Sequence, residues 1–158
     1  MGDVASSKKK SAAVEVRVFG QTDVGQVREH NEDNFLIADL TRKTRSFEAT
    51  TVHTLGRSGA VFGVCDGMGG AAAGEVASQM AVDILVEAMR RGGPPRGRDA
   101  LARRLVQSVE EAGRRIFQAA QKERSRRGMG TTTTAAVLVD KVLFLGEVGD
   151  SRGYLLRK

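Results

Sequence analysis

The sequence is short of the residues on which disulfide-bonded and aromatic-rich proteins depend. Its 158 residues include one cysteine, no tryptophan, one tyrosine and two prolines, and aromatic residues make up 4%. A lone Cys65 cannot form an internal disulfide, so we expect a small core residue in a protein of a reducing compartment, the cytoplasm. With so few aromatics, the core must be built from Val, Leu, Ala and Met side chains.

Long apolar runs are also missing. No stretch of the sequence approaches the roughly 18 apolar residues of a membrane span. The first ten residues, MGDVASSKKK, lack the apolar middle of a secretory signal. We therefore expect no membrane span.

Positive charge is in excess, with a formal net charge of +6, and it gathers in residues 8–10, 90–98 and 122–127. None of these runs is interleaved with the aromatics that a single-strand nucleic-acid binder uses for stacking. A solvated surface is therefore favoured, and we expect no nucleic-acid partner. A basic nucleic-acid binder stays a distant alternative, testable by a steep loss of binding with salt.

The order of patterns along the chain predicts an α+β domain over residues 14–158, after a disordered basic lead-in at residues 1–13. Alternation from Val14 to Val18 and short apolar runs at 35–38 and 60–65 predict strands, and 41–58 has the polarity of a hairpin or insertion.

Helical spacing predicts one helix from about Gly74 to Arg91 and a second from Asp99 to Gly128. Two β-rich runs at 132–139 and 142–148 flank an Asp140-Lys141 turn, and a third run starts at Gly153. Helices on an antiparallel sheet are expected. Because the third run stops at Lys158, we expect a fold that is incomplete at the carboxyl end.

The Asp66-Gly67 pair ends the apolar run VFGVC. A carboxylate at the rim of a sheet, followed by a backbone carbonyl that no side chain shields, suits a hard cation such as Mg²⁺ or Mn²⁺. A simple turn leaving the strand explains the same residues equally well.

A second acidic pair, Glu32-Asp33, lies in REHNEDNF, a few residues after Arg28. The two carboxylates can share a cation, one directly and one through water, while Arg28 can fork onto a phosphate. Taken alone, the segment is better explained as a solvated charged loop.

Two other phosphate chemistries are excluded by inspection. The glycines from Gly69 to Gly74 have the spacing of a nucleotide-binding loop, but Glu75 and Val76 stand where it needs Lys and Ser or Thr. A cysteine phosphatase built on Cys65 would lack its phosphate-cradling arginine, and the neighbouring Asp66 disfavours a thiolate.

Four motifs together resemble the bacterial branch of the type-2C (PPM), metal-dependent protein phosphatases. They are TDVGQVREHNEDNF, VFGVCDGMGG followed by AGEVAS, GMGTTTTAAVL and VGDSRGYL, in the family's order over about residues 20–157. The resemblance implies two antiparallel sheets in a sandwich flanked by helices, with a Mn²⁺ or Mg²⁺ centre of two ions at one rim. It also implies hydrolysis of protein phosphoserine and phosphothreonine by a metal-activated hydroxide.

Carried over residue by residue, the resemblance implies that Asp66 bridges both metals and that the Gly67 carbonyl binds one. Glu32 and Asp33 would hold the other, partly through water, and Arg28 would bind the substrate phosphate. Asp150 matches a position that helps to bind a third, weaker metal in bacterial relatives, although capping a turn explains it as well. Phosphorylated proteins, and the serine/threonine kinases that make them, are the implied partners.

Two departures from the family pattern bear on catalysis. Ala71 stands where bacterial members often place a histidine that protonates the leaving group, a contribution of about 10²–10⁴-fold. His30 is a candidate substitute, although a histidine in a polar loop is more often simply exposed. After Asp150 the sequence has no acidic residue, whereas the family completes its centre with further aspartates.

Two hypotheses follow. The first is a phosphatase of which these residues form the amino-terminal part. The second is a truncated, non-catalytic remnant that binds phosphoproteins through Arg28 and part of the metal rim. The threonine run 131–134 is interpreted as strand, chosen for β-propensity and not for catalysis.

Overall fold

The computed structural model describes residues 14–46, 50–69 and 72–157. The expectations for the lead-in at 1–13 and for Ala71 fall outside these residues. Strand order in the main antiparallel sheet is β3-β2-β5-β7-β8, with short β6 beside β5, while β1 and β4 pair separately. In chain order the elements are β1 Glu15–Phe19, β2 Asp33–Asp39, β3 Thr44–Ser46, β4 Thr50–Thr54, β5 Ala60–Met68, α1 Ala73–Arg90, α2 Arg98–Lys122, β6 Gly130–Thr131, β7 Thr133–Val139 and β8 Val142–Val148.

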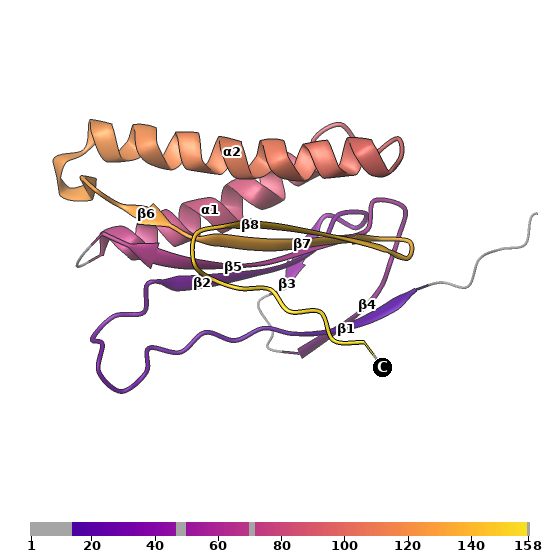
Figure 1. The fold of residues 1–158 in the computed structure, drawn as a ribbon, viewed down its shortest axis with the longest axis horizontal. Coiled ribbons are helices and arrows are strands. Elements are labelled where there is room, and N and C mark those ends of the chain that lie inside the picture. Colours follow the sequence, from indigo (N-terminus) through magenta and orange to yellow (C-terminus); the bar gives the residue numbers. More distant parts are fainter. Residues whose placement is uncertain (1–13, 47–49, 70–71, 158) are drawn as a thin grey trace, which may run out of the picture.

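Both helices lie on one side of the main sheet, and the β1–β4 pair lies on the other (Figure 1). Helix α1 packs on β5 and β2, and α2 packs on α1 and reaches β8. The buried side chains between these layers are aliphatic or small, with Cys65 among them, as the composition predicted. The largest are Leu36, Val61, Leu85, Met89, Leu101 and Val137.

Most expected elements are confirmed, but the region 41–58 is not one hairpin. Strand β3 pairs with β2 in the main sheet, whereas β4 pairs with β1 in the other. Arg42 links the end of β2 to the end of β4, because its guanidinium donates to the Asp39 carboxylate and to the Thr54 carbonyl (2.9 Å). The region is therefore the connection between the two sheets.

Asp39 is the anchor of this connection, because its buried carboxylate caps the turn after β2. It accepts hydrogen bonds from the backbone N–H groups of Thr41 and Arg42, both at 2.8 Å. Burial alone would raise the pKa of Asp39, but these hydrogen bonds and the Arg42 charge outweigh it and lower that pKa below its ordinary value.

The expected end of the second helix and the expected strand after Gly153 were both wrong. The second helix ends at Lys122 and not at Gly128, because Glu123 has extended backbone angles and Arg124–Arg126 form a separate 3-10 turn. The expected third strand after Gly153 does not form, and Tyr154 and Leu156 are exposed. β-propensity needs a neighbouring strand to supply backbone partners, and no described strand pairs with this segment. Within the described ranges, neither helix is long and apolar enough to span a bilayer.

Candidate metal centre

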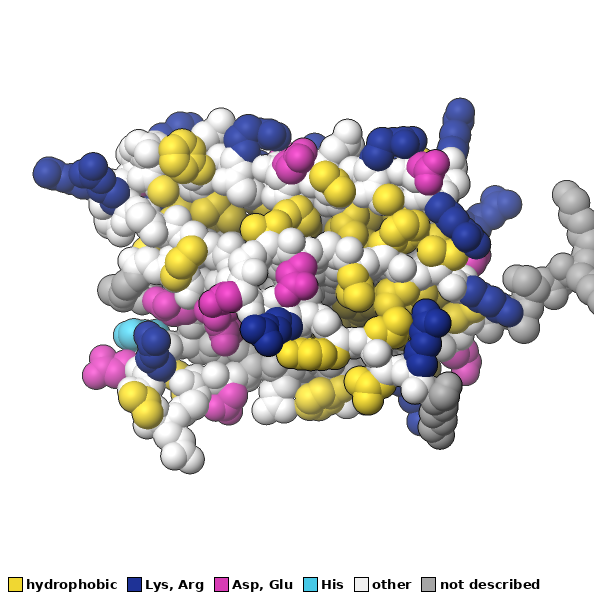
Figure 2. Space-filling model, viewed as in Figure 1, with side chains coloured by type: hydrophobic (Ala, Val, Ile, Leu, Met, Phe, Trp, Pro, Cys, Tyr) yellow, Lys and Arg dark blue, Asp and Glu magenta, His cyan; other side chains and the backbone are white. Residues whose placement is uncertain are grey.

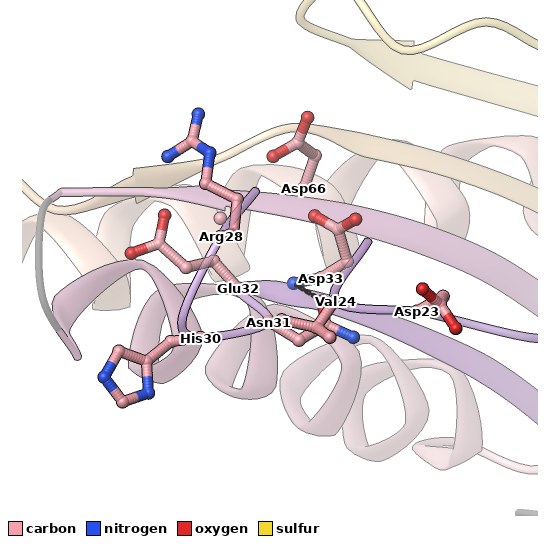
Figure 3. A pocket seen from close by; sticks show the side chains of 9 residues that line it. Asp23, Val24, Arg28, His30, Asn31, Glu32, Asp33 and Asp66 are labelled. Atoms are coloured by element: carbon pink, nitrogen blue, oxygen red, sulfur yellow. Dashed lines mark hydrogen bonds between the residues drawn. The ribbon is translucent and has the colours of Figure 1, made fainter. Parts of the chain in front are cut away.

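Two strands bring together carboxylates that are far apart in the sequence. Strands β2 and β5 run antiparallel, in a register that sets Asp33 directly opposite Asp66. Directly opposed residues have Cβ atoms about 4.5–5.5 Å apart. Figure 3 shows the two side chains rising from neighbouring strands on the same side of the sheet rim. The pair is thus a product of register and not of sequence proximity.

The surroundings of Asp33 disfavour its ionisation. The pKa of Asp33 is raised from its ordinary value, first by partial burial, then by the charge of Asp66 and a hydrogen bond to it, and last by the charge of Glu32. Three carboxylates thus gather at this rim, and among the described residues none of them forms an ion pair with a Lys or Arg side chain. Such a site attracts a positive ion.

Gly67 and Gly74 let the start of α1 approach the rim closely. A Cβ on Gly67 would lie 2.1 Å from the Gly74 carbonyl oxygen and 2.5 Å from the Glu32 carbonyl oxygen. A Cβ on Gly74 would lie 2.7 Å from the Glu32 carboxyl carbon. The Glu32 side chain consequently lies over the first turn of α1. A larger residue at Gly74 would displace this side chain, and one at Gly67 would clash with the backbone of Gly74 and Glu32.

The backbone on either side of the rim is held by hydrogen bonds. Gly67 N–H donates to the Glu32 carbonyl at 3.2 Å, and the Ser78 hydroxyl of α1 donates to the same oxygen at 2.5 Å. The Asn31 side-chain oxygen accepts from Asp33 N–H at 2.9 Å. Asn31 was missed from the sequence, although an Asn two residues before a strand is a recognisable turn signal.

The threonine run does more than form strand. Thr131 Oγ1 donates to the Asp66 carbonyl at 2.9 Å, and Thr132 Oγ1 accepts from Asp66 N–H at 3.0 Å. The interpretation that β-propensity alone explains these threonines was therefore incomplete, because two of them fix the Asp66 backbone. Asp150 is not among the residues that line the cleft around the Asp33–Asp66 pair, whereas its neighbour Ser151 shares a 2.7 Å hydrogen bond with Thr132.

A cleft of about 230 Å³ opens at this rim and contains most of the predicted residues. Arg28 is exposed there, and no described carboxylate lies within ion-pairing distance of its guanidinium. In Figure 3 the Arg28, Glu32 and Asp66 side chains point to the same side, whereas the His30 ring points away from them. The lining residues are Asp23, Val24, Arg28, His30, Asn31, Glu32, Asp33, Asp66 and Gly67.

The donor set fits a hydrated hard cation. Among the residues that the structure describes, no three His, Cys, Asp or Glu side chains gather closely enough to hold a metal. The Asp33–Asp66 carboxylate pair with a nearby backbone carbonyl remains, which matches how Mg²⁺ binds, through one or two carboxylates and several waters. Burial raises the pKa of the Cys65 thiol to about 11, so a thiolate plays no part at neutral pH.

The structure is that of an α+β protein with a candidate hard-cation site at the ends of strands β2 and β5, and comparison with known proteins gives the family. The family model for Protein phosphatase 2C matches residues 48–156, so the chain belongs to that family.

Similar proteins agree with this assignment. The chain is 34% identical over 137 residues to the serine/threonine phosphatase stp of Listeria innocua, covering 87% of this chain and 48% of that protein. It is 36% identical to the serine/threonine protein phosphatase PstP of Mycobacterium tuberculosis, covering 90% of this chain and 23% of PstP. The crystal structure of the PstP catalytic domain in complex with two manganese ions superposes with a TM-score of 0.67 at 32% identity, covering 91% of this chain and 53% of that one. The chain thus spans about half the length of the first of these relatives.

Proposed function

We propose that the chain carries the amino-terminal part of a metal-dependent phosphatase that hydrolyses phosphoserine and phosphothreonine in proteins. The observation that carries this proposal is that Asp33 and Asp66 form a pair in one cleft with Arg28, whose guanidinium forms no ion pair with a carboxylate of the described residues. The pair can hold cations, and the guanidinium can hold a phosphate. The manganese-bound relative supports the choice of Mn²⁺ or Mg²⁺.

In this proposal Asp66 and Asp33 hold the cations, Gly67 contributes its carbonyl oxygen, and Glu32 acts through water. Two bound hard cations would lower the pKa of a water molecule so that hydroxide is available near neutral pH. A third ion at Asp150 remains a weaker part of the proposal.

The chain's own residues orient the substrate. Arg28 would bind two phosphoryl oxygens with its planar fork and offset the charge that develops on them. Thr131 and Thr132 would keep the Asp66 carboxylate in place by fixing its backbone, as their hydrogen bonds of 2.9 and 3.0 Å indicate. Phosphorylated proteins would be the substrates, with serine/threonine kinases as functional partners. A cytoplasmic location suits the free thiol of Cys65.

Hydrolysis of an aryl phosphate and of a phosphothreonine peptide tests the proposal. Activity should require Mn²⁺, stop with chelator, and fall at least 100-fold in Asp66→Asn. Asp140→Asn is the matched control, because it removes a carboxylate from a turn at the opposite end of β7 where Asn tolerates the φ of 51°. Equal activity in the chain and in Asp66→Asn would contradict catalysis by this centre.

A second candidate is a non-catalytic remnant that binds phosphoproteins. It is favoured by the absence of a three-carboxylate cluster among the described residues. It predicts phosphate-dependent peptide binding that Arg28→Gln weakens about tenfold, with no turnover above the Asp66→Asn level. Turnover that disappears in Asp66→Asn would exclude it.

A further inference from the structure

A basic turn follows α2, at the end of the molecule where the metal rim also lies. This turn, residues 122–127, contains four cationic side chains, of which Lys122, Arg124 and Arg127 are exposed. It is an ordered structure: Arg126 N–H donates to the Glu123 carbonyl at 3.0 Å, and Met129 N–H donates to the Arg126 carbonyl at 3.1 Å. The positive side chains are therefore presented from a fixed backbone.

The acidic residue within the turn is already engaged. Glu123 forms an ion pair with Arg126 at 2.8 Å and accepts a hydrogen bond from Ser125 at 2.8 Å. No carboxylate in the described part of the chain lies within 4.0 Å of the cationic groups of Lys122, Arg124 or Arg127. Three positive charges on one turn thus have no partner of opposite sign in the described structure.

The basic turn is tied to the rim through β6. Met129 is buried and lies against Gly69, and β6 pairs with β5 in a register that sets Thr131 opposite Gly67. Four residues of chain span at most about 14 Å, and paired strands lie about 5 Å apart, so the Cα atom of Arg127 is within about 20 Å of Gly67. An extended peptide covers that distance in about six residues.

Figures 1 and 2 show the same arrangement. Helix α2 ends on the side of the molecule where β5 ends, α1 begins and β6 lies. Lys and Arg side chains project there, above a group of Asp and Glu side chains at the same end. Because Gly67 and Arg28 line the same cleft, the basic turn and that cleft lie at the same end of the molecule.

We propose that Lys122, Arg124 and Arg127 select phosphorylated peptides that carry acidic residues, or a second phosphate, about four to six positions from the scissile phosphate. The inference rests on the proposed function, because it assigns a specificity to that same centre. Exposed charge pairs are individually weak, but three on one ordered turn add up and steer acidic ligands at low salt.

The opposite end of the molecule supplies a matched control. Arg96, Arg98 and Lys141 are also exposed cations, and Arg98 and Lys141 line a depression far from the rim, where α2 begins and β7 turns into β8. Neutralising them changes the net charge by the same amount. A general effect of net charge would therefore appear in both variants.

The test measures anisotropy of four fluorescent peptides in Mn²⁺ at low salt, with phosphoserine or serine at the centre and acidic or neutral flanks. For the whole chain, acidic flanks should tighten binding of the phosphopeptide about five- to twentyfold, and less at high salt. Replacing the three residues of the turn by Gln should remove this preference, and the three-Gln control at the far end should keep it. Replacing them by Glu should invert it toward basic flanks.

The outcomes distinguish the proposed function from the flank preference. If the unsubstituted chain bound the phosphoserine and serine peptides equally well with either kind of flank, the proposed function would be overturned. Phosphate dependence with no flank preference, or a preference that survives in the Gln variant of the turn, would overturn the present inference alone. A single-stranded oligonucleotide that binds more tightly than the acidic phosphopeptide, and depends on the same three residues, would also overturn it.

Discussion

Asp66→Asn is expected to stabilise the metal-free chain while abolishing its response to metal. Asp33 and Asp66 face each other in register, and this repulsion contributes to the raised pKa of Asp33. Two unit charges about 5 Å apart in a water-like medium repel by about 1 kcal/mol, and both side chains are exposed, so the water value applies. Removing one charge should raise the melting temperature by about 2–4 °C.

Metal should reverse the order of the melting temperatures of the unsubstituted chain and the Asp66→Asn variant. A cation at 100 times its dissociation constant adds about 2.7 kcal/mol of stability, equivalent to roughly 5–10 °C, to the chain that binds it. Thermal unfolding followed by circular dichroism, with chelator and with Mn²⁺, measures both effects. The unsubstituted chain should melt below Asp66→Asn in chelator and above it in Mn²⁺, and Asp140→Asn should follow the unsubstituted chain.

The pH dependence of stability independently checks whether Asp66 destabilises the metal-free chain. Because the folded-state pKa of Asp33 is raised, the unfolded state releases its proton first, and the metal-free chain loses stability as pH rises above about 4 until the raised pKa is passed. In Asp66→Asn this loss should shrink. A metal-free Asp66→Asn variant that melts below the unsubstituted chain at pH 7 would refute the reasoning.

Three further predictions concern the scaffold around the centre. Gly67→Ala should destabilise the chain by about 3 kcal/mol or prevent folding, since its Cβ would lie 2.1 Å from the Gly74 carbonyl oxygen; chemical denaturation measures this, with Gly113→Ala, where a Cβ meets nothing within 4 Å, as the tolerated control. Asp39→Asn should lower stability at pH 7 by about 1–3 kcal/mol, and because the folded-state pKa of Asp39 is lowered, the difference should vanish as pH falls below about 4 in urea titrations. Cys65, whose pKa burial raises to about 11, should resist iodoacetamide at pH 8 and react in urea, as mass spectrometry would show; rapid labelling of the folded chain would contradict its burial.

Local sequence patterns were sufficient for the helices and for most strands. The spacing of apolar residues located α1 within one residue at each end, and the glycines and prolines after Arg90 marked its stop. The second helix was predicted too long because its basic last turn remains helix-like in composition. Backbone angles at Glu123, which no periodicity reports, end it at Lys122.

The candidate site also contains some residues that the sequence predicted and others that it did not. Its candidate residues, Arg28, Glu32, Asp33, Asp66 and Gly67, were singled out by the family motifs. Residue type alone allowed a cation and a phosphate to bind there, but a turn explained Asp66-Gly67 equally well and a solvated loop explained Glu32-Asp33 better. The roles of Thr131 and Thr132 were not predicted, because a hydrogen bond to the backbone of a residue 65 or 66 positions away leaves no local pattern. Asn31 differs, since it bonds to a residue two positions away and its local turn signal was overlooked.

The sequence by itself determined the family and supplied the candidate site residues, since the family motifs depend on side-chain type and order along the chain. The tertiary structure decided which of them meet. Register alone sets Asp33 opposite Asp66, and the packing of α1 against the rim requires Gly67. The pairing of β6 with β5 brings the basic turn to the metal rim, because contacts between distant segments are chosen by the whole fold and not by any one of them.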